Sequence, residues 1–348
     1  MNEKQYKRVF ILGSGFSKSF CSEMPTMKNL EDAIFKKERI GPILENYDTL
    51  FQYVEDFNKI DKSGKFGFKS IENLVTTIFS RRIFGSFSDE INTKELQYQI
   101  LRYIYNSIHP FHVDDEAQKI MLNFLKICGS EHYPENSYKG KNLIVTYNYD
   151  LLMEEILRTI RTNYHIDYSI ELANYTQFSN DYYPSNTRPL QILKLHGSFN
   201  WFQTLGSANI DISSIFQVDP WDENHIIYSE DNPLFIPMSH GKEIFLHGSL
   251  YNFIWAKAFN YIADADEIYV IGYGFPDSDI NNLLYIYPYQ RKIKKIVVLY
   301  ENETDSNYKK LVEIFGKNKI LIKDAKEFIE ENYRAFYSFN NISRIIGV

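Results

Sequence analysis

Residues 141–160 read KNLIVTYNYDLLMEEILRTI and contain a clear transition from strand to helix. The apolar run at 143–145 is short and rich in β-branched residues, which predicts a buried parallel strand. After Asp150 the apolar residues repeat every four positions, which predicts a helix. Asn148 therefore lies at the carboxyl end of a strand, where open α/β sheets bind ligands. Taken alone, the segment is also explained by an Asx turn and a helix cap.

The same pattern of a short apolar strand ending in a turn recurs along the chain. We predict further strands at 8–12, 191–195, 267–272, 295–300 and 319–322. Strands that alternate with helical segments are typical of parallel sheets. The predicted fold class is α/β, a Rossmann-like parallel sheet with helices on both faces and a large helical insertion after the first strand.

The insertion is predicted at residues 25–134, where apolar residues recur with a 3.6-residue period. This segment is far longer than a βαβ crossover requires. We therefore divide the chain into a Rossmann-like domain, residues 1–24 and 135–348, and a helical subdomain, residues 25–134. Residues 163–189 have little periodicity and predict a long loop, and residues 203–235 show no clear pattern.

Composition narrows the class of protein. The 348-residue chain has a formal net charge of −7. Proteins that bind nucleic acid normally present a basic face, so we expect no direct contact with nucleic acid. Cys21 and Cys128 form no C-x-x-C pair, which excludes a four-cysteine zinc ribbon and indicates a reducing compartment. We find no secretory signal and no apolar run of membrane-spanning length. We therefore expect a cytoplasmic protein with no membrane contact.

Two glycine-rich turns follow predicted strands. The first contains Gly13, Ser14, Gly15, Phe16 and Ser17, and the second contains Gly272, Tyr273 and Gly274. Glycines at a strand end allow the backbone to approach a phosphate, and a following helix N-terminus attracts negative charge. However, Lys18 replaces the third glycine of the G-x-G-x-x-G fingerprint, and no G-K-[ST] follows. A hydride-transfer domain and a P-loop are therefore disfavoured.

Polar residues also follow two other predicted strands. His196 comes directly after the strand at 191–195, where a histidine can act as a general base near neutral pH. A structural hydrogen-bonding role is the alternative. Glu301 and Asn302 follow the strand at 295–300, where an acid or an amide can bind ribose hydroxyls.

The remaining histidines do not predict a metal site. His109 and His112 have a plausible spacing for ligands, but no third ligand lies beside them in the sequence. His240 and His247 have no assigned role.

In their order along the chain, these strand ends resemble the sirtuin-like superfamily. The segments that carry the resemblance are GSGFS at 13–17, TYNYD at 146–150, KLHGS at 194–198 and IGYGFPDSD at 271–279. The chain is most similar to the sirtuin-like NADase branch of bacterial anti-phage defence. It departs from the protein deacylases of the superfamily in two ways. It lacks their four-cysteine zinc ribbon, and residues 19–25 read SFCSEMP where the deacylases have a G-x-x-x-F-R segment.

The resemblance implies roles for the candidate residues. Asn148 would position the attacking water, Asp150 would recognise the nicotinamide, and His196 would accept a proton. The resemblance also implies a set of NAD-binding residues. Gly13, Ser14, Gly15, Phe16 and Ser17 would hold the diphosphate, Gly272, Tyr273 and Gly274 would border the adenosine ribose, and Glu301 or Asn302 would bind its hydroxyls.

The predicted function is hydrolysis of NAD to nicotinamide and ADP-ribose, with NAD as substrate and no metal. Because unregulated hydrolysis would deplete the host of NAD, we expect a gated effector of anti-phage defence. We expect a homo-oligomer or a separately encoded activator, such as the HerA-family ATPase or Argonaute-like protein of related systems. The alternatives are a non-catalytic NAD or ADP-ribose sensor that regulates a partner, and an ADP-ribosyltransferase or deacylase.

Overall fold

The computed structural model describes residues 7–39, 46–60, 69–84, 90–108, 112–128, 142–159, 164–170, 173–174, 188–203, 215–217, 232–240, 242, 249–276, 279–299 and 303–338. The strands are β1 (Arg8–Leu12), β2 (Leu143–Thr146), β3 (Tyr164–Asp167), β4 (Ala173–Asn174), β5 (Arg188–Lys194), β6 (Gly197–Gln203), β7 (Ile215–Gln217), β8 (Asn232–Phe235), β9 (Glu267–Ile271), β10 (Ile293–Val298) and β11 (Ile320–Ile322). The α-helices are α1 (Ser14–Phe20), α2 (Met27–Phe35), α3 (Asp48–Ile60), α4 (Ile71–Phe84), α5 (Glu90–Ile108), α6 (Asp115–Cys128), α7 (Leu152–Thr159), α9 (Ser249–Asp264), α10 (Ile280–Ile286), α11 (Ser306–Phe315) and α12 (Ala325–Ser338).

The large sheet has seven strands in the spatial order β11-β10-β9-β1-β2-β5-β3, and each neighbouring pair is parallel. After β1 the chain adds β2, β3 and β5 on one side and later β9, β10 and β11 on the other. The strand order therefore reverses at β1. Open α/β sheets bind ligands at such a point, outside the carboxyl ends of the strands. The predicted Rossmann-like parallel sheet is confirmed.

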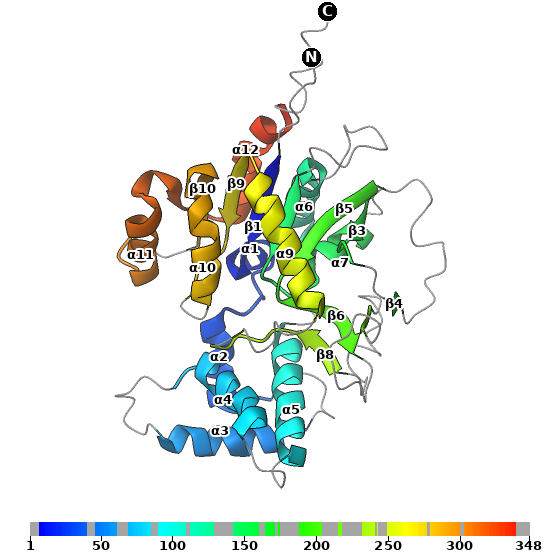
Figure 1. Ribbon diagram of the computed structural model, residues 1–348, viewed down its shortest axis with the longest axis vertical. Coiled ribbons are helices and arrows are strands. Elements are labelled where there is room, and N and C mark those ends of the chain that lie inside the picture. Colours follow the sequence, from blue (N-terminus) through cyan, green and yellow to red (C-terminus); the bar gives the residue numbers. More distant parts are fainter. Residues whose placement is uncertain are drawn as a thin grey trace, which may run out of the picture.

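Helices cover both faces of this sheet (Figure 1). Side chains alternate along β1, as the period of a strand requires. Val9 and Ile11 belong to a core shared with α9, α10 and α11, whereas Phe10 and Leu12 belong to a core shared with α1, α6, α7 and α12. The four side chains are at most 2% exposed, so β1 is buried on both sides.

Helices α2 to α5 form a separate layer at the carboxyl end of the sheet (Figure 1). Their core contains Leu50 and Leu74, and it also includes Leu151 from the turn after β2, Phe199 from β6 and Phe235 from β8. This helical layer therefore packs directly on segments that follow the strands. Helix α6 shares the core of the sheet instead. The domain boundaries at 24/25 and 134/135 stay predictions.

The predicted loop at 163–189 is wrong where β3 and the start of β5 lie. β3 pairs in parallel with β5, from Tyr164 opposite Arg188 to Asp167 opposite Gln191. It is a four-residue edge strand, too short for its alternation to stand out in a polar stretch. A second sheet of order β4-β7-β6-β8 was not predicted, and its β6 strand begins directly after His196.

Both cysteines, Cys21 and Cys128, are free and buried. Within the described residues, the structure contains no helix that is both long enough and apolar enough to cross a membrane.

Candidate functional site

The register of the sheet places Asn148 and His196 in neighbouring turns. Thr146, the last residue of β2, is paired with Lys194, the last residue of β5. Asn148 lies two residues after Thr146, and His196 lies two residues after Lys194. The ring of His196 also contacts the ring of Tyr147, with centroids 5.2 Å apart. Two residues that are far apart in the sequence therefore come from adjacent turns at the carboxyl edge of the sheet.

The first turn after β1 and the turn after β2 are joined by side-chain hydrogen bonds. The Asn148 amide donates to the Gly13 carbonyl at 2.8 Å and to Ser17 Oγ at 2.9 Å. Ser17 Oγ in turn donates to Asp150 Oδ2 at 2.7 Å, and Asp150 Oδ1 accepts from the Leu152 N–H at 3.1 Å. Asp150 therefore makes the predicted turn at the start of α7 and also fixes Ser17.

Lys194 is a buried cation beneath this turn. Its Nζ lies 2.6 Å from the Asp150 carbonyl oxygen, 2.8 Å from Ser198 Oγ and 2.7 Å from Glu154 Oε1. Burial raises the pKa of the Asp150 carboxyl, and the charge of Lys194 only partly opposes that rise. We did not predict a role for Lys194. The available signal was a single lysine within the otherwise apolar end of β5.

His196 lies in an aromatic environment and is 4% exposed. Its ring is near those of Tyr147 and Trp255, and the Trp255 N–H donates to the Leu195 carbonyl at 2.8 Å. Burial and the charge of Lys242 lower the pKa of His196 to about 3, against the opposing effects of Asp279 and a hydrogen bond to the Tyr147 backbone. The imidazole is therefore neutral over the physiological pH range.

Lys242 and Asp279 form a second ion pair near His196, with side chains 13% and 4% exposed. Tyr273 donates its hydroxyl hydrogen to Asp279 Oδ2 at 2.8 Å and accepts from the Asn282 amide at 2.9 Å. Burial opposes ionisation of Asp279, but the interactions with His196, Lys242 and Tyr273 outweigh it and lower the pKa of the carboxyl. Neither Asp279 nor Lys242 was among the predicted site residues.

The two glycine-rich turns pack against each other. A Cβ on Gly272, which has a φ of +69°, would lie 2.0 Å from the Phe16 nitrogen, and a Cβ on Gly13 would lie 2.6 Å from Tyr273 atoms. The N–H groups of Gly13, Gly15 and Phe16 donate to the carbonyls of Ile271, Gly272 and Gly13. Close packing of the turns therefore explains these glycines, and phosphate binding stays a prediction.

The side chains of the two turns differ in exposure. Phe16 is 1% exposed and packs on Phe20 and Phe124, whereas Ser14 is exposed. Tyr273 is buried and stacks on Tyr147 with ring centroids 4.2 Å apart. Any contact of Phe16 with a ligand would therefore involve its backbone.

Several predicted residues lie outside the described part of the chain: Glu301, Asn302, His109 and His247. His112 is exposed, and the His240 N–H donates to Thr76 Oγ1 at 2.8 Å. Within the residues that are described, no group of three or more His, Cys, Asp or Glu side chains could hold a metal ion.

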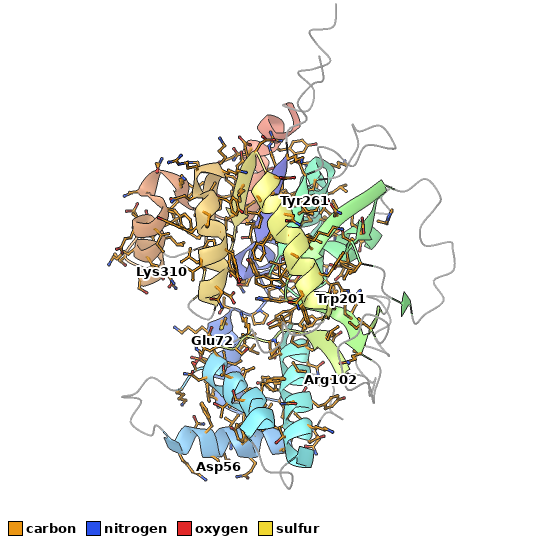
Figure 2. All side chains as sticks on the ribbon, viewed as in Figure 1. Asp56, Glu72, Arg102, Trp201, Tyr261 and Lys310 are labelled. Carbon is orange, nitrogen blue, oxygen red and sulfur yellow. The ribbon has the colours of Figure 1, made fainter. Side chains whose placement is uncertain are left out.

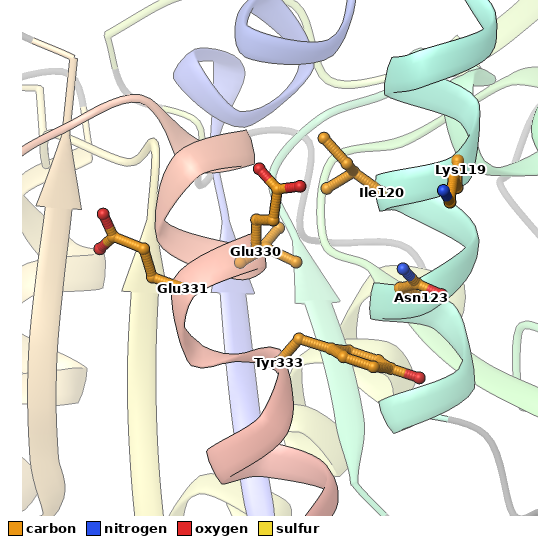
Figure 3. Close-up of a pocket in the computed structure, with 7 residues that line it drawn as sticks. Lys119, Ile120, Asn123, Glu330, Glu331 and Tyr333 are labelled. Atoms are coloured by element: carbon orange, nitrogen blue, oxygen red, sulfur yellow. The ribbon is translucent and has the colours of Figure 1, made fainter.

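A pocket of about 530 Å³ lies elsewhere, between α6 and α12 (Figure 3). It is lined by residues such as Lys119, Asn123, Glu330 and Tyr333. None of the predicted site residues lines it.

Figure 2 shows Trp201 where the sheet meets the helical layer, whereas Arg102 and Asp56 lie within that layer.

A family model described as a SIR2-like domain matches residues 142–318. The match includes Asn148, His196 and Gly272 but not the first glycine-rich turn. No curated protein matches the chain.

Solved structures of Sir2 proteins are similar to the chain at low identity. A Sir2 homologue in complex with NAD has 14% identity and a TM-score of 0.44, covering 96% of this chain and 90% of that one. An ADP-ribose complex of a mutant Sir2 homologue has 12% identity and a TM-score of 0.48, covering 97% and 94%. The fold assignment rests on the strand order described above.

Proposed function

The chain belongs to the family of proteins with a SIR2-like domain, and from this premise we propose that it is an NAD⁺ hydrolase. The bond that it cleaves is the one between nicotinamide and ribose. The observation that supports this proposal best is the position of Asn148 and His196 in adjacent turns, next to the point where the strand order reverses.

The side chains at this edge fit a ligand with amide and hydroxyl groups. His196 Nε2 is buried and has no hydrogen-bond partner among the described residues. Buried polar atoms normally have a partner, so a water or a ligand hydroxyl would satisfy this nitrogen. Asn148 and Asp150 supply an amide and a carboxylate, which can bind a carboxamide and orient a water.

In the proposed reaction, the ribose C1′–nitrogen bond breaks, nicotinamide leaves with the bonding electrons, and water adds its oxygen to C1′. Asn148 orients that water, Asp150 binds the nicotinamide carboxamide, and His196 accepts the proton that water loses. The hydrogen bonds from Asn148 to Gly13 and Ser17 hold its amide in place before substrate arrives.

The remaining predicted residues have binding roles in this proposal. The turn at 13–17 holds the diphosphate, Gly272, Tyr273 and Gly274 border the adenosine ribose, and Glu301 or Asn302 binds its hydroxyls. The helical subdomain at 25–134 covers the site. Cleavage is gated by self-assembly or by a separately encoded partner, and the gated enzyme depletes NAD during anti-phage defence in the cytoplasm.

A non-catalytic NAD or ADP-ribose sensor is the second candidate function. It is favoured by the low basicity of His196, whose pKa of about 3 is far below the neutral range in which a general base works best. Tight binding of NAD without turnover, unaffected by Asn148→Ala, would select this function.

The test is nicotinamide release from NAD by the purified protein, measured by chromatography and in cells. His196→Ala should lower release by roughly 100-fold or more, because general base catalysis contributes at least that much, and Asn148→Ala should lower it by a similar factor, because the attacking water loses its orientation. His112→Ala is the matched control, since it removes an exposed histidine. Equal release by wild type and both site variants, all folded by circular dichroism, would reject the assigned site.

A further inference from the structure

Asp279 is the residue before α10, where its type predicts a helix cap, yet its side chain caps nothing. The carboxylate instead pairs with Lys242 and accepts from Tyr273. At 5% exposure, a carboxylate diverted from its helix into a buried ion pair indicates a role other than starting α10.

A continuous set of contacts connects Asp279 to His196. The Tyr273 hydroxyl bonds to Asp279, the Tyr273 ring stacks on Tyr147 at 4.2 Å and 12°, and the Tyr147 ring meets His196 edge to face at 5.2 Å. Tyr273 lies in the turn after β9, Tyr147 in the turn after β2, and His196 in the turn after β5. Asp279 is therefore anchored to the same aromatic group that surrounds His196.

We propose that Lys242 and Asp279 are positioning residues of opposite charge that together control how readily His196 accepts a proton. The inference rests on the proposed function, in which His196 removes a proton from the attacking water. Asp279 stabilises the imidazolium that this transfer creates, and Lys242 opposes it.

Among the described residues, Lys242 and Asp279 are the two charged groups that act on His196, and the tyrosines packed near it are uncharged at neutral pH. Burial raises the pKa values of Tyr147, Tyr273 and Tyr251, whose hydroxyl faces Gly197, so all three stay protonated. The balance between one cation and one anion therefore sets the electrostatic potential at the imidazole. Burial makes His196 a weak base and the charge of Lys242 weakens it further, so losing that cation makes His196 a stronger base.

An NMR titration of the imidazole tests the charges without requiring turnover. The signal of His196 is assigned by its absence from His196→Gln. Lys242→Met should raise the midpoint of this signal by about one pH unit or more, because a neighbouring cation disfavours the charged form. Adding Asp279→Asn to Lys242→Met should lower the midpoint again. Lys59→Met is the control, since its exposed pair with Asp56 at 2.7 Å lies in α3.

Kinetics then connect the charges to the reaction. In Lys242→Met the acid limb of kcat/KM for nicotinamide release should move upward with the NMR midpoint, and Asp279→Asn should lower kcat roughly 10-fold. An unchanged midpoint in Lys242→Met, or a double variant titrating no lower than that single variant, would overturn the inference. Shifted midpoints without nicotinamide release would leave the charge assignment intact and reject the hydrolase.

Discussion

Two buried ion pairs lie at the carboxyl edge of the sheet, and different parts of the chain hold them. Lys194 and Glu154 come from β5 and α7, and Lys194 also bonds to the backbone of Asp150. Lys242 and Asp279 come from the segments that precede α9 and α10. The first pair fixes a backbone turn between regular elements, whereas the second acts on a side chain through its charge. Similar ion pairs therefore have different roles: the Lys194–Glu154 pair stabilises the fold, and the Lys242–Asp279 pair affects the reactivity of His196.

The largest effect is expected from breaking the first pair. Lys194→Met leaves the buried Glu154 carboxylate without its cation, which should lower the free energy of unfolding by about 3–5 kcal/mol. Urea unfolding at neutral pH measures the loss. Lys242→Met should cost less, because the side chain of Lys242 is 13% exposed and that of Lys194 is 0% exposed.

A double variant sharpens this prediction. Lys194→Met with Glu154→Met replaces both charges by apolar side chains, which often restores the stability lost on removing one partner. Recovery of stability without recovery of nicotinamide release would assign Lys194 to positioning of Asp150 as well as to folding. A double variant as unstable as Lys194→Met would contradict the pairing.

An effect of intermediate size on stability is expected when the pH is lowered, because His196 titrates. His196 has a pKa of about 3 when folded and an ordinary value of 6.5, so the unfolded chain binds more protons between these values. Stability should fall by about 1.4 kcal/mol for each unit of decreasing pH in that window. Asp279, whose pKa is lowered from 3.8, loses its contribution only below that value.

The measurement compares urea unfolding of wild type and His196→Gln from pH 6.5 down to about pH 5, where the histidine contribution dominates the difference. The variant should lose less stability over this interval. Parallel loss in both proteins would show that His196 is not the group that titrates on unfolding.

The smallest effect is expected from Tyr273→Phe. The variant keeps the ring that stacks on Tyr147 but removes the hydroxyl that bonds to Asp279. The hydroxyl also accepts from the Asn282 amide, so two hydrogen bonds are lost, and stability should fall by about 1–2 kcal/mol, seen as a modest decrease in Tm. It should also weaken the coupling of Asp279 to His196, so an unchanged imidazole titration would argue against the aromatic connection.

The sequence predicts the regular parts of the fold well. Six strands of the large sheet are apolar runs that end in turns, and the periodicity of helices such as α4 is clear. β3 was missed because four residues in a polar stretch give too little alternation. The second sheet was missed because its strands β4, β7 and β8 are short, and their pairing depends on tertiary contacts.

The site is predictable only where its residues end strands. Asn148 and His196 follow β2 and β5, so their neighbourhood follows from the sheet order. Lys242 lies in a segment without periodicity. Asp279 has the residue type of a helix cap, and residue type alone does not show that its carboxylate points away from the helix. Side-chain direction depends on packing between distant segments, and a single sequence does not contain that information directly.

The central position of β1 affects how the protein is made. Residues 9–12 pair with 143–146 on one side, and residues 8–12 pair with 267–271 on the other, so both partners leave the ribosome long after β1. The helices α2 to α5, which contact one another locally, can assemble earlier. Until β9 has been synthesised, the apolar β1 has an unpaired edge that can aggregate. Nascent chains of this protein should therefore depend on chaperones late in translation.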